Sequence, residues 1–211
     1  MAKRCRIGNV GFDPIIRNPK FLGGVTGGAG EHGPHAIIEG PGDRLYGVIG
    51  NHTRLTTEWS VDSPYNLHDE GHLLPRYLDP RGHARNIKSP GGLIYSVDRE
   101  GKDWRVHAAG FRNVYDIAFN RHGELFAYDS DMEWDIGMPW YRPTRLYHAI
   151  DGADFGWRTG SSKWSDIYPD SLPAAIDCGR GSPCGVVLYD NDKFPKRFQG
   201  TLFGADWAQG R

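Results

Sequence analysis

The feature that most constrains the fold is a recurring hairpin, in which a short apolar strand, a turn rich in Gly, Asn, Asp and Pro, and a second short apolar strand follow one another. The turns of these hairpins are Gly40-Pro41-Gly42-Asp43, Arg99-Glu100-Gly101-Lys102, Asn120-Arg121-His122-Gly123 and a longer one containing Phe194-Pro195. Short strands separated by turn residues are typical of a sandwich, a barrel or a propeller. Repetition of one hairpin type favours the β-propeller, in which each blade is one such unit stacked on the next.

Composition agrees with an all-β chain. Glycine, at 29 of 211 residues, has about twice its usual share. No segment has a good helical periodicity, although Thr144 to Ala149 could form one helical turn. The net charge of −1 gives no electrostatic reason to expect nucleic acid or an anionic membrane as a partner. No apolar run approaches the ~18 residues of a membrane span.

The repeat is irregular because residues 52–90 and 132–170 are long insertions rich in Pro, Asp, Tyr and Trp. Long loops of this kind are commonly functional. At roughly 40–50 residues per blade, the chain completes only about three to four blades. We therefore expect residues 21–211 to form a partial β-propeller domain, a fragment of a longer protein, preceded by an N-terminal segment of uncertain structure at 1–20. That segment is basic but lacks the apolar region of a complete secretory signal.

The cysteines leave the redox compartment open. Cys178 and Cys184 could close a small loop in an oxidising compartment or remain two free thiols, and Cys5 makes the count odd. No Cys-x-x-Cys-His is present, so the chain does not itself attach a c-type haem.

Two neighbouring patterns carry the candidate site. Gly110-Phe111-Arg112-Asn113 offers a guanidinium beside an amide, which suits a ligand rich in carboxylates or carbonyls. An acidic run follows, in which carboxylates at every second position repel one another unless a cation or hydrogen bonds intervene. Its members are Asp129, Asp131, Glu133 and Asp135. This run could bind calcium, or two of its carboxylates could instead pair with Arg142 or Arg145.

The chain resembles the glucose/sorbosone dehydrogenase family of sugar dehydrogenases that use pyrroloquinoline quinone (PQQ). The resemblance covers about residues 20–211, and the closest branch is the bacterial "membrane-bound dehydrogenase domain". The motifs that carry it are Gly30-Glu31-His32-Gly33-Pro34-His35, Gly40-Pro41-Gly42-Asp43 with Leu45-Tyr46, Gly50-Asn51-His52-Thr53, Gly110-Phe111-Arg112-Asn113, the acidic run, Pro139-Trp140-Tyr141-Arg142-Pro143, Asp154-Phe155-Gly156-Trp157 and Ser182-Pro183-Cys184-Gly185. Val114 stands where the family has a proline.

The resemblance implies a six-bladed β-propeller with PQQ and Ca²⁺ as cofactors. His32 matches the family's catalytic base, and a neutral imidazole suits that task. His35, three residues on, is the alternative base, and either histidine could instead bind a metal or only hydrogen-bond a turn carbonyl. Arg112 and Asn113 would contact cofactor and substrate, or Arg112 would tie two blades together. Trp157 would lie against a planar cofactor or sugar ring, or pack between blades.

The function implied is oxidation of a sugar or alcohol hydroxyl, with electrons passing to a c-type cytochrome segment or partner outside this chain. Periplasmic or other extracytoplasmic placement follows from the resemblance alone. Two further classes stay open: a non-catalytic propeller that binds a glycan or a protein, and a calcium-dependent hydrolase of the lactonase type. In each case we expect these 211 residues alone to be inactive.

Overall fold

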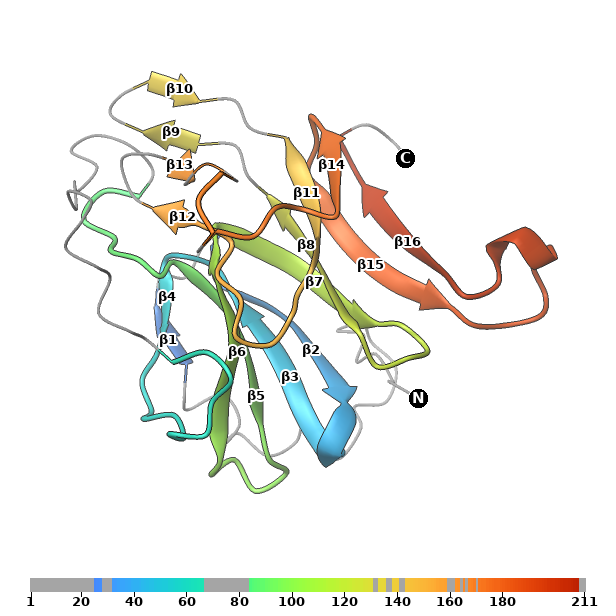
Figure 1. The fold of residues 1–211 in the computed structure, drawn as a ribbon, viewed down its shortest axis with the longest axis horizontal. Helices are drawn as coiled ribbons and strands as arrows, with labels where there is room; N and C mark the ends of the chain where they lie inside the picture. Colours follow the sequence, from blue (N-terminus) through green and yellow to red (C-terminus); the bar gives the residue numbers. More distant parts are fainter. Residues whose placement is uncertain are drawn as a thin grey trace.

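The protein is described from a computed structural model that covers residues 25–27, 32–66, 84–130, 133–135, 138–140, 143–158, 162–163, 165, 167–169 and 171–208. Within these ranges the chain is all-β, its named strands pair antiparallel, and there is no α-helix (Figure 1). Two short 3-10 turns, η3 (Pro41–Asp43) and η4 (Lys196–Phe198), join neighbouring strands. The expected all-β fold class is confirmed.

Two four-stranded sheets follow one another along the chain. The first has the order β2-β3-β5-β6 and the second, from the far edge inward, β14-β11-β8-β7. Their strands are β2 (Pro34–Gly40), β3 (Arg44–Ile49), β5 (Gly92–Val97), β6 (Trp104–Phe111), β7 (Asn113–Phe119), β8 (Leu125–Ser130), β11 (Thr144–His148) and β14 (Ile176–Gly179). Each sheet is therefore a meander in which consecutive strands are neighbours.

A third unit, the hairpin of β15 (Pro183–Tyr189) and β16 (Thr201–Asp206), follows the second sheet. Three smaller two-stranded sheets complete the described chain. They pair β1 (Val25–Gly27) with β4 (Thr53–Leu55), β9 (Glu133–Asp135) with β10 (Met138–Trp140), and β12 (Trp157–Arg158) with β13 (Ser162–Lys163).

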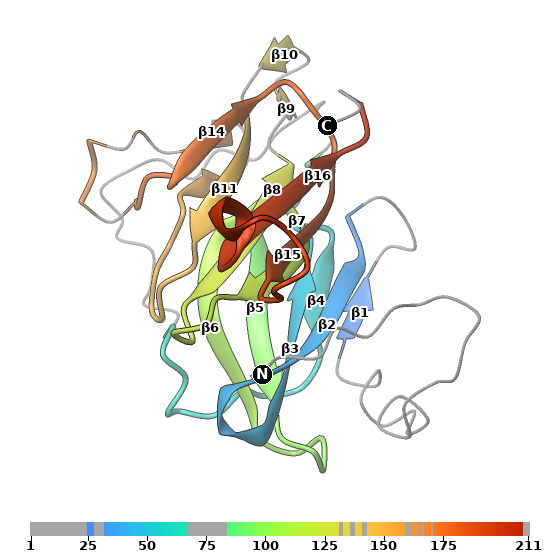
Figure 2. The same cartoon turned by 90° about the vertical axis from the view of Figure 1, so that its right-hand side faces the viewer.

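The first strands of the three units lie next to one another. β7 contacts both β2 and β15. Figure 1 shows the units side by side, and Figure 2 shows the β15–β16 hairpin in front of the second sheet. Successive antiparallel meanders whose first strands adjoin are the arrangement of propeller blades. All four hairpins predicted from turn chemistry are present, whereas six blades and fragment status stay predictions.

Main-chain and carboxylate contacts join the units. Between the second sheet and the hairpin, buried Asp116 accepts hydrogen bonds from the backbone N–H of Ile117 at 3.0 Å and of Val186 at 2.8 Å. Burial raises the pKa of Tyr128 to about 12, so its hydroxyl stays protonated and donates to Asp206 at 3.3 Å. The first and second sheets share an apolar core that contains Val48, Ile94, Phe111, Ile117 and Tyr147 among others.

One local expectation is wrong. Residues 144–149 do not form a helical turn, because Thr144–His148 is strand β11, which pairs with β8 on one side and β14 on the other. The pairing of two flanking strands outweighs local preference here. Cys178 and Cys184 are free thiols, and the Cys184 thiol donates to the carbonyl of Ala205 at 3.2 Å.

At Gly110, near the end of β6, the backbone of a second segment approaches very closely. The φ of Gly110 is +79°, and an added Cβ would lie 2.6 Å from the backbone N of both Phe155 and Gly156. Gly123 has a similar φ of +83° but open space around the same position. Gly110→Ala should therefore lower the free energy of unfolding by at least ~1 kcal/mol more than Gly123→Ala, because only the first adds a backbone clash to the strain of a positive φ. Urea denaturation of both variants gives the difference, and equal losses would contradict the close approach.

Candidate functional site

The site forms where β2 and β7 begin and β3 and β8 end. The backbone N–H of Asn51, just after β3, donates to the carbonyl of Arg112, which lies between β6 and β7, at 2.8 Å. The N–H of Gly50 donates to the carbonyl of Gly33 at 3.0 Å, and the hydroxyl of Thr53 donates to the carbonyl of His32 at 3.0 Å. These bonds bring His32, the predicted base, close to Arg112 and Asn113, which we call the Arg-Asn pair.

His32 is held by an amide. Its side chain is buried, and its Nδ1 lies 2.5 Å from Oδ1 of Asn51. An amide oxygen only accepts hydrogen bonds, so Nδ1 of a neutral His32 carries the proton and Nε2 is the basic atom. The ring of His52 lies against that of His32, with 4.4 Å between their centroids. The arrangement fixes the tautomer that a general base at Nε2 requires.

His35 takes a different position in the same site. Its Nε2 lies 2.7 Å from Oδ1 of Asn113, so this nitrogen donates and Nδ1 is its remaining acceptor. Its ring stacks on Tyr115, with centroids 5.0 Å apart. Oδ1 of Asn113 also approaches Gly50 so closely that a Cβ there would lie 2.5 Å from it. Glycine at position 50 is therefore required for the Asn113 amide to reach His35.

Asp129, at the end of β8, fixes the backbone of the Arg-Asn pair. It is fully buried, and its two carboxylate oxygens accept hydrogen bonds from the N–H of Arg112 at 3.1 Å and of Asn113 at 2.7 Å. The Arg112 side chain is also buried, and its Nη1 donates to Oγ of Ser130 at 3.5 Å. The carboxylate sets both the position of this pair and the local charge beside the guanidinium.

The rest of the acidic run follows Ser130, the last residue of β8. Glu133 and Asp135 belong to β9, which pairs with β10. Asp131 lies outside the described residues. Among the residues that the structure describes, no group of three or more His, Cys, Asp or Glu side chains is placed to hold a metal ion. Calcium binding by Asp129, Asp131, Glu133 and Asp135 stays a prediction.

Trp157 lies on β12. Its side chain is fully buried, and it packs so closely on Gly91 that a Cβ there would lie 2.4 Å from the indole. Arg158 beside it bonds to Asp154 at 3.1 and 3.2 Å. This environment is that of a residue packed between strands, and a contact of Trp157 with a cofactor stays a prediction.

The hydrogen bonds thus bring together His32, His35, Arg112, Asn113 and Asp129. Sequence reasoning did not assign roles to Asn51, His52 or Gly50, which complete the site. In the sequence, Gly50-Asn51-His52-Thr53 stands out only as one of the motifs that carry the family resemblance. The one available indication was that this motif follows directly on a predicted strand, as a site residue at a strand end does.

Comparisons with known proteins support the fold. No family model matches the chain, and no curated protein matches it. Among solved structures, it is similar to the PQQ-bound form of aldose sugar dehydrogenase from Streptomyces coelicolor, with a TM-score of 0.52 and 18% identity over 83% of this chain and 42% of that one. A glucose dehydrogenase is similar with a TM-score of 0.48 and 14% identity, over 85% of this chain and 68% of that one.

The likeness to the aldose sugar dehydrogenase concerns the fold. The chain is an all-β protein that shares the fold of the aldose sugar dehydrogenase, and it spans about two fifths of that protein's length, 42%. In the described part of the chain, no helix has the length and apolar character needed to cross a membrane.

Asp129→Asn tests the role of the buried carboxylate. The substitution turns an amide N–H towards a backbone N–H, so one of the two donors, Arg112 N or Asn113 N, loses its acceptor. We expect the free energy of unfolding to fall by about 2–3 kcal/mol. Asp98→Asn is the matched control, because Asp98 accepts from the N–H of Lys102 at 2.7 Å in an exposed turn. Denaturation midpoints that fall equally for both variants would argue against the assigned role.

Proposed function

We propose that the chain is part of a six-bladed propeller of the PQQ-dependent dehydrogenase type, which oxidises a sugar or alcohol hydroxyl and passes the electrons to a c-type cytochrome. The observation that carries the proposal is the buried His32, whose Nδ1–H is held by Asn51 beside the Asp129-fixed pair of Arg112 and Asn113. The shared fold with a PQQ-bound aldose sugar dehydrogenase supports it. Extracytoplasmic placement belongs to the same proposal.

The residues present suit a quinone that carries carboxylates. Arg112 provides guanidinium donors in a buried setting, where charge-assisted hydrogen bonds are strong. Asn113 provides an amide whose oxygen accepts from His35. We assign cofactor contact to Arg112, Asn113 and Trp157, and cation binding to the acidic run. The bound quinone would supply the hydride acceptor.

His32 would act as the base. As the hydroxyl carbon loses a hydride, the hydroxyl proton passes to Nε2 of His32, and the imidazolium that forms donates from Nδ1 to the Asn51 oxygen. His35 is the alternative base, through Nδ1, since its Nε2 is committed to Asn113. Arg112 would hold the substrate oxygen in the same neighbourhood. The proximity of these groups supplies orientation that a solvated imidazole lacks.

The proposal is tested in the full-length protein supplied with PQQ and Ca²⁺, with dye reduction followed over a panel of sugars and alcohols. His32→Ala should lower kcat/KM by about 100-fold or more, and His35→Ala should lower it less. His148→Gln is the control, because His148 lies on β11 and bonds to Glu124 at the surface.

Other outcomes would point to the other classes of function. Turnover that survives His32→Ala while falling with His35→Ala would move the base to His35. Lactone cleavage that needs calcium but no quinone would identify a hydrolase. Binding of a glycan or a protein without turnover of any kind would identify a recognition propeller, and the dehydrogenase proposal would then be wrong.

Asn51→Asp gives a pH test of the same site. A carboxylate at this position would still accept from Nδ1 of His32, but it would also stabilise the protonated imidazole, which a neutral amide does not. The base would then lose its proton only at higher pH. We expect the acidic limb of the kcat/KM profile to move to higher pH in this variant, with the rate at the plateau retained. An unmoved limb would show that His32 is not the titrating base.

A further inference from the structure

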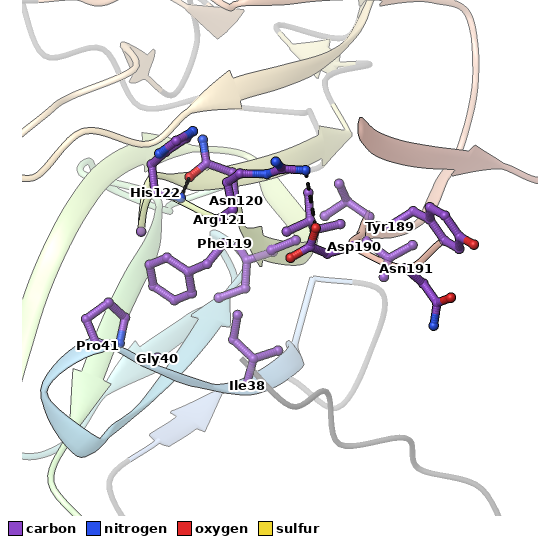
Figure 3. A pocket seen from close by; sticks show the side chains of 16 residues that line it. Ile38, Gly40, Pro41, Phe119, Asn120, Arg121, His122, Tyr189, Asp190 and Asn191 are labelled. Atoms are coloured by element: carbon purple, nitrogen blue, oxygen red, sulfur yellow. Dashed lines mark hydrogen bonds and ion pairs between the residues drawn. The ribbon is translucent and has the colours of Figure 1, made fainter. Parts of the chain in front are cut away.

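A cavity of about 830 Å³ is lined by residues of β2, β7 and β15 (Figure 3). It lies at the opposite end of β2 and β7 from His32. β2 and β7 run side by side in one direction, because His35 meets Asn113 where they begin and Gly40 meets Phe119 where they end. At ~3.3 Å per residue, seven-residue strands separate the two ends by about 20 Å. The cavity is therefore a second site, distinct from the candidate catalytic one.

The floor of the cavity is apolar and comes from all three units. Ile38 of β2, Ile117 of β7 and Val186 of β15 line it with buried side chains, and Val187 is 45% exposed. The volume falls within the range of small-molecule sites, which are mostly apolar hollows with a few placed polar groups. An apolar ligand body of moderate size would fit this floor.

The rim is built from tight turns whose conformation is locally fixed. The Asn120 side-chain oxygen accepts from the N–H of His122 and of Glu124, each at 2.9 Å, and Gly123 takes the positive φ that closes the turn. Gly40 and Pro41 form the facing rim. A rim of this kind is largely preformed, so a ligand need not order it on binding.

Arg121 brings a positive charge to the mouth of the cavity. Its guanidinium packs over Gly200, where a Cβ would collide with it, and Nη2 donates to Oδ1 of Asp190 at 3.2 Å (Figure 3). In the described part of the chain, Asp190 is the only residue that bonds to this side chain. Both partners are about half exposed, at 48% and 49%. An exposed ion pair is weak, and a guanidinium has five donors, so Arg121 can bind a second anion or exchange Asp190 for one.

We propose that this cavity binds a small amphipathic anion, whose apolar body lies on Phe119 and Val187 and whose carboxylate is bound by Arg121. Asp190 is then a competitor: it holds Arg121 in place in the absence of ligand and repels the ligand's charge when the site is filled. This inference does not depend on the dehydrogenase proposal, because the two sites share no lining residue.

Decanoate is a suitable probe, since it combines an aliphatic body with one carboxylate, and decanol is its neutral counterpart. Isothermal titration calorimetry on the full-length protein should show saturable binding of decanoate and weaker binding of decanol. Arg121→Gln should weaken decanoate about tenfold or more, because a charge-assisted hydrogen bond is lost. Asp190→Asn should strengthen it several-fold, because the competing carboxylate is removed without change of shape.

Arg197→Gln is the matched control, because Arg197 lies over the Phe198 ring at 4.6 Å and is not part of the cavity. Val187→Glu, at a half-exposed position, should abolish binding of both probes while leaving the thermal midpoint close to wild type. Opposite effects of Arg121→Gln and Asp190→Asn on decanoate support the proposal. Absence of saturable binding, equal affinity for decanol, or a change of the same sign in both variants would overturn it.

Discussion

The structure of the candidate site depends on one buried carboxylate. Asp129, the next-to-last residue of β8, accepts the backbone N–H of Arg112 and of Asn113. Arg112 joins the last strand of the first sheet to the first strand of the second, which begins at Asn113. Without an acceptor, two buried N–H groups at this junction would each carry the cost of a lost hydrogen bond. The same contact orients the Arg-Asn side chains, so the joint between two sheets and the geometry of the site have one physical cause.

Carboxylates that accept hydrogen bonds also connect the units elsewhere. Asp116 accepts from Val186 across β7 and β15, and Asp154 accepts from Gly156 N at 2.7 Å and from the hydroxyl of Tyr65 at 3.0 Å. Where one sheet ends and the next begins, the sheet ladder cannot satisfy every backbone donor. A short carboxylate on a neighbouring strand can accept two donors at once, which explains why acidic side chains are buried here despite the cost of desolvating a charge.

The sequence predicts the parts of the fold that local chemistry specifies. The turn at Asn120–Gly123 needs only an Asn that bonds its own backbone and a Gly that takes a positive φ, and both are visible in four residues. Strand β11 has no clear local pattern, because it is specified by its pairing with β8 and β14. Asp129 stands in an acidic run that suggests cation ligands, and only the folded chain shows two N–H groups against it. The Asn51 contact to His32 spans 19 residues and has no local pattern either.

The two ends of β2 and β7 differ in the same way: one end is held by contacts between near neighbours in the sequence, and the other by long-range contacts. At the turn end, Gly123 and Asn120 set the backbone through near neighbours, so the rim around Arg121 is formed whenever the hairpins form. At the other end, His35 and Arg112 depend on contacts that form only when both sheets have come together, because His35 bonds to Asn113 and the Arg112 carbonyl accepts from Asn51 N–H. Weakening the contact between the first and second sheets should therefore disturb the histidine site before the cavity. Fewer of the hydrogen bonds that hold the rim of the cavity run between these two sheets.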